Sequence, residues 1–414
     1  MSERDGLVAD QYETHPYPER NPADEKKRLI EGSPSDLLEL SHYLFRGRTP
    51  NPFRALIAGG GTGDAAIMLA QHCASAGLAA EIVYLDMSTA ARAVVEARAR
   101  MRGLANLRFV TGSLLDVADI ATGPYDYIDC CGVLHHLEVP EDGLRALAGQ
   151  LKPTGGMGLM VYGEYGRRGV YETQALLRQL APPSLPPQDR LTQTRRLLEA
   201  LPRTNWLKRN PFVQDHQHAG DAGLYDLLLH ARDRAYTVPQ LAEFVASAGL
   251  AIVDFIEPAR YAPATYLRDP RLLALLQDRS PFEQAAAAET IAGNLRKHTV
   301  YVAAVERATS CSATTADRDL VPVLRRHPPE ALAKALRSGH LSVDLDGFPA
   351  KFPAPARAAA IAQRLDGRRT VAEILTDLRA ADPSLSDDQA GEIFTSLYHL
   401  LAGLNLLFLT DRRG

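Results

Sequence analysis

The sequence is poor in cysteine, and its cysteines follow no metal-binding or disulfide pattern. The four are spread over 414 residues without a CxxC spacing: Cys73, Cys130, Cys131 and Cys311. Their positions exclude a zinc knuckle and a small disulfide scaffold, and they fit a reducing compartment. We therefore expect a cytoplasmic protein.

Long apolar runs are missing as well. The longest, residues 397–409, is shorter than the ~20 residues that a transmembrane helix needs, and it contains a His and an Asn. Residues 1–20 are polar and acidic, whereas a signal peptide begins basic and continues apolar. The sequence thus predicts neither a membrane segment nor secretion.

An excess of one charge sign is also absent. The formal net charge is −4, and hydrophobic and charged residues make up 46% and 23% of the chain, as in soluble globular proteins. This balance gives no reason to expect nucleic acid or an anionic membrane as the main partner. A length of 414 residues allows two or three domains.

From residue 40 on, short apolar runs alternate with longer helical patterns. Strands are expected at residues 54–58, 80–87, 107–117, 125–137, 157–166, 251–258 and 298–306. Helical patterns between them are typical of a parallel sheet that is covered on both faces. The predicted fold class is therefore α/β, with a doubly wound, Rossmann-like sheet of seven strands.

Composition shifts divide the chain further. Residues 1–40 form an N-terminal arm or lid before a main domain at residues 41–307, and the Arg-, Pro- and Leu-rich residues at about 166–235 are expected as a helical insertion. The small, polar residues 308–318 resemble a linker. Residues 319–414 predict an α-rich, winged-helix-like accessory domain. Because acids and bases alternate along it, docking of a partner or a homodimer is favoured over DNA binding.

The stretch after the first predicted strand is dominated by glycine: Gly59, Gly60, Gly61 and Gly63. Without a Cβ, such a turn lets the backbone approach a ligand closely. A P-loop is excluded because no Lys-Ser/Thr pair follows, and a dinucleotide GxGxxG pattern fails at Asp64. The remaining GxGxG spacing points away from a pyrophosphate, so we expect no nicotinamide oxidoreductase.

Five motifs in order carry a resemblance to a known family: AGGGTGD, VYLDMS, VTGSLLDV, DYIDCCGVLHHL and LKPTGGMGLMVYGE. Over residues 50–305 the chain resembles the class I S-adenosylmethionine-dependent methyltransferases. The resemblance implies S-adenosyl-L-methionine as cofactor. It also implies that the glycine turn faces the amino acid end of the cofactor, whose carboxylate can accept backbone N–H bonds near a helix N-terminus.

The resemblance assigns further cofactor contacts. It implies that Asp86, at the end of the second strand, accepts hydrogen bonds from both ribose hydroxyls, with Met87 against the adenine. Ser113 and Leu114 stand where the family often has an Asp that binds the adenine amine. Ile57 replaces a frequent acid, so the cofactor ammonium is expected to find acceptors elsewhere, such as the carbonyl of Gly59 or of Cys131.

Residues 11–22, QYETHPYPERNP, resemble an N-terminal segment found in one subgroup of this family. Its aromatic residues, Tyr12 and Tyr17, have two interpretations. They can fasten the arm to the core, or they can close over the sulfonium, whose charge a π face favours.

Transfer of a methyl group from a sulfonium needs little beyond alignment of the two reactants. If the acceptor must lose a proton, the candidates lie where the fourth and fifth strands end: His135, His136, Tyr162 and Glu164. The alternatives are a structural role for the histidines and an ion pair between Glu164 and Arg167 or Arg168.

Residues 215–221, DHQHAGD, hold two histidines and two aspartates, but a third ligand at a fixed distance is missing. We expect a polar, substrate-recognising loop there and no metal. The residues that follow predict the lip of an acceptor pocket: His230, Asp233, Arg234 and Tyr236.

The sequence therefore predicts a methyltransferase whose acceptor is a protein or peptide side chain, because an added domain helps to grip a large substrate. Protein-lysine methyltransferases with an appended C-terminal domain are similar in layout. A small metabolite or natural product is the alternative acceptor. A non-catalytic sensor or scaffold that binds S-adenosylmethionine is the alternative function.

Overall fold

The computed structural model describes residue 13, residues 17–218 and residues 220–411. The chain forms two compact units. The first comprises Pro52–Leu250, Gly293–Thr299 and the described residues before Asp36, and the second comprises Asp36–Asn51, Ala251–Ala292 and the described residues from Val300 on. The predicted division at residues 40, 307 and 319 remains a prediction.

The central sheet has the strand order β3-β2-β1-β4-β5-β8-β7, with a short β6 paired to β5. Its strands are β1 (Phe53–Ala58), β2 (Ala80–Asp86), β3 (Leu107–Thr111), β4 (Tyr125–Cys131), β5 (Leu151–Gly163), β6 (Ala235–Tyr236), β7 (Leu250–Phe255) and β8 (Lys297–Ala304). Neighbours from β3 to β6 run parallel. The α/β class and the Rossmann-like sheet are confirmed, and the order reverses between β1 and β4, where such sheets open a crevice.

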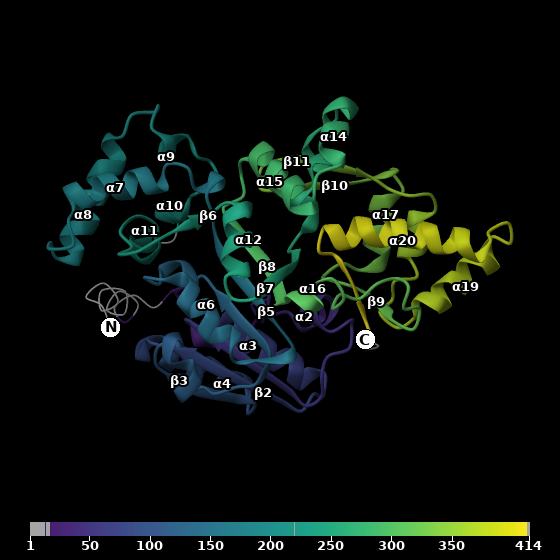
Figure 1. Ribbon diagram of the computed structural model, residues 1–414, viewed down its shortest axis with the longest axis horizontal. Coiled ribbons are helices and arrows are strands. Elements are labelled where there is room, and N and C mark those ends of the chain that lie inside the picture. Colours follow the sequence, from purple (N-terminus) through teal and green to yellow (C-terminus); the bar gives the residue numbers. More distant parts are fainter. Residues whose placement is uncertain (1–12, 14–16, 219, 412–414) are drawn as a thin grey trace. The chain divides into compact units, whose positions relative to one another are not determined.

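Helices connect these strands and pack on the sheet (Figure 1). They include α3 (Asp64–Ser75), which packs against β2, and α4 (Thr89–Arg102), which packs against β2 and β3. Ser88 caps the N-terminus of α4, and Gly103 ends it in a left-handed conformation with φ 67°. Helix α6 (Pro140–Ala148) ends early, and β5 begins at Leu151, six residues before the predicted start at 157.

The predicted insertion forms a helical layer with an apolar core of its own. Its helices are α7 (Val170–Leu180), α8 (Pro187–Ala200), α9 (Trp206–Arg209), α10 (Asp215–His218) and α11 (Gly220–Leu228). Val170, Leu177, Leu191 and Leu224 are buried in this core. The chain then returns to the sheet through β6, where Ala235 pairs with Tyr162 of β5.

In the second unit, α2 (Leu37–Leu44) packs against the last strand of the chain, and an apolar core lies among the C-terminal elements. These are β9 (Val321–Leu324), α17 (Pro329–Leu336), the hairpin β10 (His340–Asp344) and β11 (Pro349–Pro353), α18 (Ala358–Ala362), α19 (Val371–Ala381), α20 (Asp387–Gly403) and β12 (Leu407–Thr410). The winged-helix-like character of residues 319–414 stays a prediction.

Residues 308–318 do not behave as a free linker. The backbone carbonyl of Cys311 accepts a hydrogen bond from the Arg46 amide at 2.8 Å, and the Ala313 amide donates to the His42 carbonyl at 2.8 Å. Cys311 and Ala313 are buried. These contacts make the segment part of the second unit. Small residues suit close packing as well as flexible linkers, so composition alone does not distinguish the two.

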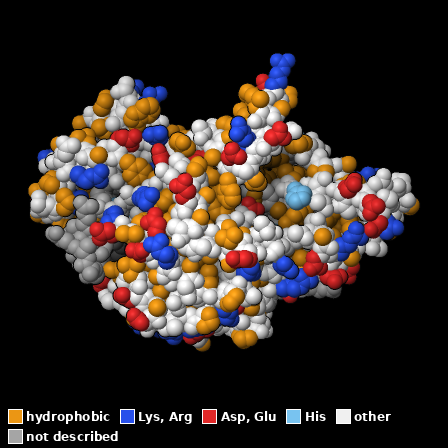
Figure 2. Space-filling view, in the orientation of Figure 1, with side chains coloured by type: hydrophobic (Ala, Val, Ile, Leu, Met, Phe, Trp, Pro, Cys, Tyr) orange, Lys and Arg blue, Asp and Glu red, His pale blue; other side chains and the backbone are white. Residues whose placement is uncertain are grey.

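Acidic and basic side chains are interspersed on the face drawn in Figure 2, with apolar side chains between them. Within residues 17–218 and 220–411, no helix is both long enough and apolar enough to cross a bilayer.

Candidate functional site

The glycine turn between β1 and α3 has a backbone that side chains would disrupt. Gly59, Gly61 and Gly63 have φ angles of 71°, 50° and 95°, in the left-handed region that favours glycine. A Cβ on Gly59 would lie 2.3 Å from Cγ2 of Val133, and one on Gly60 would lie 2.5 Å from the Tyr84 ring. The turn is therefore bare because it must pass close to its neighbours in the protein as well as to any ligand.

Asp86 ends β2 directly beside this turn. Its Oδ2 accepts a hydrogen bond from the Gly61 amide at 2.7 Å, and its Oδ1 accepts one from the Ser88 amide at 2.9 Å. Burial raises the pKa of the Asp86 carboxyl, and these backbone donors act in the opposite direction. The Tyr84 hydroxyl donates to the Gly61 carbonyl at 2.7 Å. The predicted cofactor residues of β1 and β2 are thus brought together.

The other predicted cofactor contacts lie at the same edge of the sheet. Met87 follows Asp86 and is 38% exposed. Ser113 Oγ accepts from the Leu115 amide at 3.2 Å and so caps a short 3-10 helix, which includes the buried Leu114. Cys131 is the last residue of β4, and its thiol donates to Asp129 Oδ2 at 3.5 Å. Their cofactor roles remain predictions.

The N-terminal segment passes over the glycine turn. Tyr12 lies outside the described residues, but Tyr17 is described, and its carbonyl oxygen lies 2.9 Å from where a Cβ on Gly61 would stand. The Thr62 hydroxyl donates to the Pro18 carbonyl at 2.7 Å. The segment that resembles the subgroup motif therefore lies beside the predicted cofactor turn.

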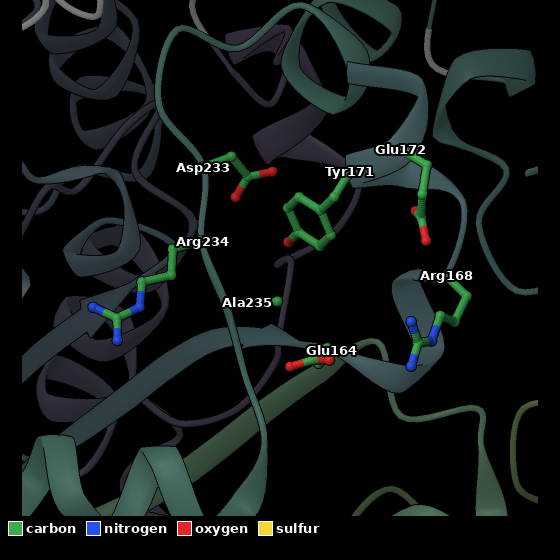
Figure 3. A pocket seen from close by; sticks show the side chains of 7 residues that line it. All are labelled: Glu164, Arg168, Tyr171, Glu172, Asp233, Arg234 and Ala235. Atoms are coloured by element: carbon green, nitrogen blue, oxygen red, sulfur yellow. The ribbon is translucent and has the colours of Figure 1, made fainter. Parts of the chain in front are cut away.

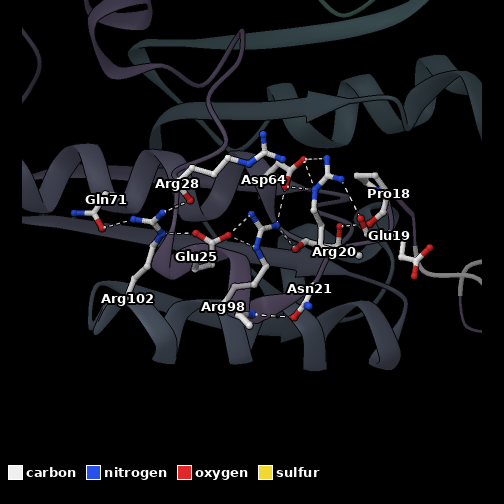
Figure 4. Close-up of polar contacts among 12 residues, drawn as sticks. Pro18, Glu19, Arg20, Asn21, Glu25, Arg28, Asp64, Gln71, Arg98 and Arg102 are labelled. Atoms are coloured by element: carbon white, nitrogen blue, oxygen red, sulfur yellow. Dashed lines mark hydrogen bonds and ion pairs between the residues drawn. The ribbon is translucent and has the colours of Figure 1, made fainter. Parts of the chain in front are cut away.

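A buried ion network fixes this segment (Figure 4). Asp64, the first residue of α3, accepts hydrogen bonds from Arg20 at 2.6 Å and from Arg98 at 2.7 Å. The 1% exposed Arg98 of α4 also pairs with Glu25 at 2.6 Å, and Arg102 contacts the same carboxylate. Sequence reasoning missed this network. Two features of the sequence pointed to it: Asp64 stands where the GxGxxG pattern needs glycine, and Arg20 lies near the end of the N-terminal motif.

Past β4 and β5, the predicted catalytic residues form an aromatic cluster. His135 and His136 belong to a 3-10 helix (Leu134–His136) that follows Val133, the residue that contacts the glycine turn. The centroids of the His135 and Tyr162 rings lie 4.1 Å apart. The Arg167 guanidinium lies over the Tyr162 ring, 3.7 Å from its centroid. Burial is the main cause that raises the pKa of Tyr162 well above its usual value.

Residues predicted for the pocket lip join this cluster. Asp233 Oδ2 accepts from Arg167 at 3.0 Å and from Gln174 at 3.2 Å. His230 stacks on His136 with the ring centroids 3.9 Å apart. Burial lowers the pKa values of His135 and His230 well below the usual range, so both rings are neutral at physiological pH. An ion pair of Glu164 with Arg167 or Arg168 was one of two interpretations of Glu164, and the structure pairs Arg167 with Asp233.

A pocket opens beside Asp233 (Figure 3). Its polar lining consists of Glu164, Arg168, Tyr171, Glu172, Asp233 and Arg234. Glu172 is occupied by the Gly169 amide at 2.9 Å, and Arg234 approaches Glu141 at 3.7 Å. The carboxylate of Glu164 forms no ion pair within the described residues. The fourth predicted lip residue, Tyr236, is buried, and its carbonyl accepts from the Glu164 amide at 3.1 Å.

Residues 215–221 do not join this cluster. His216 and His218 lie on α10, and His216 lines a different pocket together with Lys208 and Asn210. Asp221 forms an ion pair with Arg195. The side chain of Asp215 lies outside the described part of the chain. The loop's predicted role in substrate recognition remains a prediction.

Comparisons with known proteins agree with this geometry. Residues 56–157 match the family model described as "Methyltransferase domain". An uncharacterized protein of Synechococcus sp. (strain PCC 6301) is 33% identical over 231 residues, which is 54% of this chain and 54% of that protein. The matched region thus spans about half the length of this curated relative.

Two solved structures share the fold over most of the chain. PKMT2 from Rickettsia typhi is 13% identical with a TM-score of 0.59, and PKMT2 in complex with AdoHcy is 14% identical with a TM-score of 0.62. Each match covers 91% of this chain and 75% of PKMT2. At these identities the likeness concerns the fold. Together with the family match, it confirms the predicted class I methyltransferase fold.

Proposed function

We propose that this chain, which carries a methyltransferase domain over residues 56–157, transfers a methyl group from S-adenosylmethionine to an acceptor. The observation that carries the proposal is the contact of Asp86 with Gly61 at the edge where the strand order reverses. There a strand-end carboxylate and a bare turn are in direct contact. PKMT2, which shares the fold, has been solved with AdoHcy.

The residues of the turn fit this cofactor. The N-terminus of α3, beside the glycine turn, suits the carboxylate of the methionine moiety. The amides of the four turn glycines donate within the protein, so the turn contributes its close approach rather than its donors. The acid at that helix end, Asp64, is paired with Arg20 and Arg98, so its charge does not oppose a second carboxylate. Asp86 supplies acceptors for the ribose hydroxyls. When bound, the sulfonium supplies an activated methyl group, and the chain supplies alignment.

The pocket beside Asp233 favours a cationic or amine acceptor. Arg234 approaches Glu141, and the carboxylate of Glu164 forms no ion pair within the described residues. Glu164 is therefore the carboxylate of this pocket that we assign to the acceptor. An exposed side chain of a protein or peptide, such as a lysine, has an amine on a flexible stem that suits a carboxylate-lined pocket. We favour this class over a small metabolite.

The chemistry requires a neutral, aligned amine rather than a strong base in the protein. The raised pKa of Tyr162 keeps its phenol protonated at neutral pH, so Tyr162 serves as a packing surface and not as a proton acceptor. A carboxylate at Glu164 orients the amine and stabilises the cation that forms on methylation. Proton removal by His135 or His136 remains a prediction.

Methyl-labelled S-adenosylmethionine tests the proposal. The full chain is incubated with label and a cell extract, and label is counted in the macromolecular and the small-molecule fractions. We expect label in macromolecules, and its loss with Asp86→Ala. Label that enters small molecules alone would support the metabolite alternative, and tight cofactor binding without any transfer would support the sensor.

A further inference from the structure

Three buried side chains in the cluster leave ligand atoms without partners. Neither ring nitrogen of His135 has a hydrogen-bond partner among the described residues, and the same holds for Nε2 of His136 and Oδ1 of Asp233. One ligand atom from each residue lies within 4.8 Å of the other two. An unmet buried polar atom costs about 1–3 kcal/mol, so these four atoms in one cluster require an explanation.

The opposite polar atoms of two of these side chains are already fixed. Nδ1 of His136 lies 2.8 Å from the Arg232 carbonyl oxygen, which only accepts, so Nδ1 carries the proton and Nε2 presents a lone pair. Oδ2 of Asp233 accepts from Arg167 and Gln174, which leaves Oδ1 directed elsewhere. Metal-binding histidines and carboxylates in proteins are oriented by outer contacts of this kind.

The packing around the cluster also leaves room for a metal ion. His135 is fully buried, and neither of its ring nitrogens has a hydrogen-bond partner among the described residues. Arg167 and an ion would each have one carboxylate oxygen of Asp233, so the guanidinium leaves the Oδ1 position available.

From these contacts we propose that His135, His136 and Asp233 bind a divalent transition-metal ion. Two imidazole nitrogens and one carboxylate oxygen are donors suited to Zn²⁺, Fe²⁺ or Co²⁺, whereas Mg²⁺ and Ca²⁺ favour oxygen ligands. Three protein ligands leave coordination positions open, and Asp233 also lines the pocket of Figure 3. Sequence spacing did not reveal this site because Asp233 is far from the histidines in the chain.

Titration of the untagged, full-length, chelator-treated chain with Co²⁺ and Zn²⁺ tests the site without S-adenosylmethionine, so its result is independent of the proposed function. We expect one equivalent of Co²⁺ with the visible absorption of a low-coordinate ion, displaced by Zn²⁺. His136→Ala should weaken binding by about 100-fold or more, because even outer contacts of a metal ligand contribute about 10–100-fold.

Asp233→Asn is the second variant and should also weaken Co²⁺ binding. Because this change also removes the charged partner of Arg167 and can reduce stability, His135→Ala serves as a third variant. The double variant His216→Ala/His218→Ala removes two histidines of α10 and should bind as the wild type does. Absence of Co²⁺ binding in the wild type would mean that water fills the cluster and would overturn the proposal. Binding that none of the three cluster variants weakens would overturn it too.

Discussion

Gly59 and Val133, 74 residues apart in the chain, meet where the loops after β1 and β4 come together: a Cβ on Gly59 would lie 2.3 Å from Val133 Cγ2. Because φ of Gly59 is also 71°, both space and backbone conformation require glycine there. The contact links the proposed cofactor turn to the 3-10 helix that carries His135 and His136. A side chain at position 59 would therefore displace Val133.

The first prediction concerns this contact. Gly59→Ala should lower the free energy of unfolding by about 2–5 kcal/mol, from left-handed strain of about 1–2 kcal/mol and overpacking of about 1–3 kcal/mol, and it should abolish cofactor binding. Gly77→Ala is the control, because its φ is 64° but nothing lies within 4 Å of the added Cβ. Chemical denaturation of both variants checks this, and equal losses would contradict the steric argument.

The second prediction concerns the buried ion network. Arg98→Met removes the most buried partner of Glu25 and leaves Arg102 on the same carboxylate, so we expect a loss of about 3 kcal/mol in the free energy of unfolding, the lower end for a broken buried pair. Arg100→Met removes an exposed arginine, 3.8 Å from Glu96, and should change stability by less than about 1 kcal/mol. Urea titration distinguishes the two. A small loss for Arg98→Met would show that the network does not fasten the N-terminal segment.

The third prediction is a pH dependence. Burial raises the pKa of Asp129 from 3.8 to about 6, against hydrogen bonds from Ser35 and Cys131. The folded state therefore holds the Asp129 proton more tightly than the unfolded chain does. The stability that this proton contributes is complete below about pH 4 and is lost as the pH rises through 6. A pKa difference of about two between the folded and unfolded states corresponds to roughly 3 kcal/mol of folding free energy. The stability of Asp129→Asn relative to wild type should rise by up to that amount between pH 4 and 7.

Unfolding curves across this pH range, with the exposed Asp119→Asn as control, measure the difference. A constant difference between Asp129→Asn and wild type would mean that Asp129 titrates alike in the folded and unfolded states, and it would contradict the assignment.

The fourth prediction separates orientation from proton transfer in the acceptor pocket. With a cationic acceptor, Glu164→Gln should lower kcat/KM by about 10–100-fold, because one charged contact of about 1.5–3 kcal/mol is lost. Tyr162→Phe keeps the ring between His135 and Arg167 and should change kcat by less than about tenfold. A loss of 100-fold or more in Tyr162→Phe would assign the phenol a proton-transfer role, since general catalysis contributes about that much.

Local sequence patterns were sufficient to predict much of the fold. The apolar run at 54–58 lies within β1 (Phe53–Ala58), and the glycine turn, α3 and the strand-end Asp86 follow as expected. These features depend on alternation, glycine content and strand ends, which are readable within about ten residues. Residues 308–318 show the limit of composition, because a small, polar segment can pack on α2 as well as link two domains.

Contacts between distant residues were not predictable in this way. Asp64 meets Arg20 and Arg98, and Asp233 meets Arg167 and lies beside the two histidines, only because the fold brings separate loops together. One sequence offers many arginines for each acid, so charge type alone does not select the pair. The start of β5 was misplaced for a similar reason: Lys152 continues the strand and binds Asp126 of β4 at 2.8 Å.

Titration calorimetry with S-adenosylhomocysteine tests the central claim, that Asp86 and the glycine turn hold the cofactor. The wild type and Asp116→Ala, which removes an exposed acid nearby, should bind one equivalent, and Asp86→Ala should bind about 100-fold more weakly, because two charge-assisted hydrogen bonds are lost. Absence of binding in the wild type, or equal affinity in Asp86→Ala, would contradict the claim.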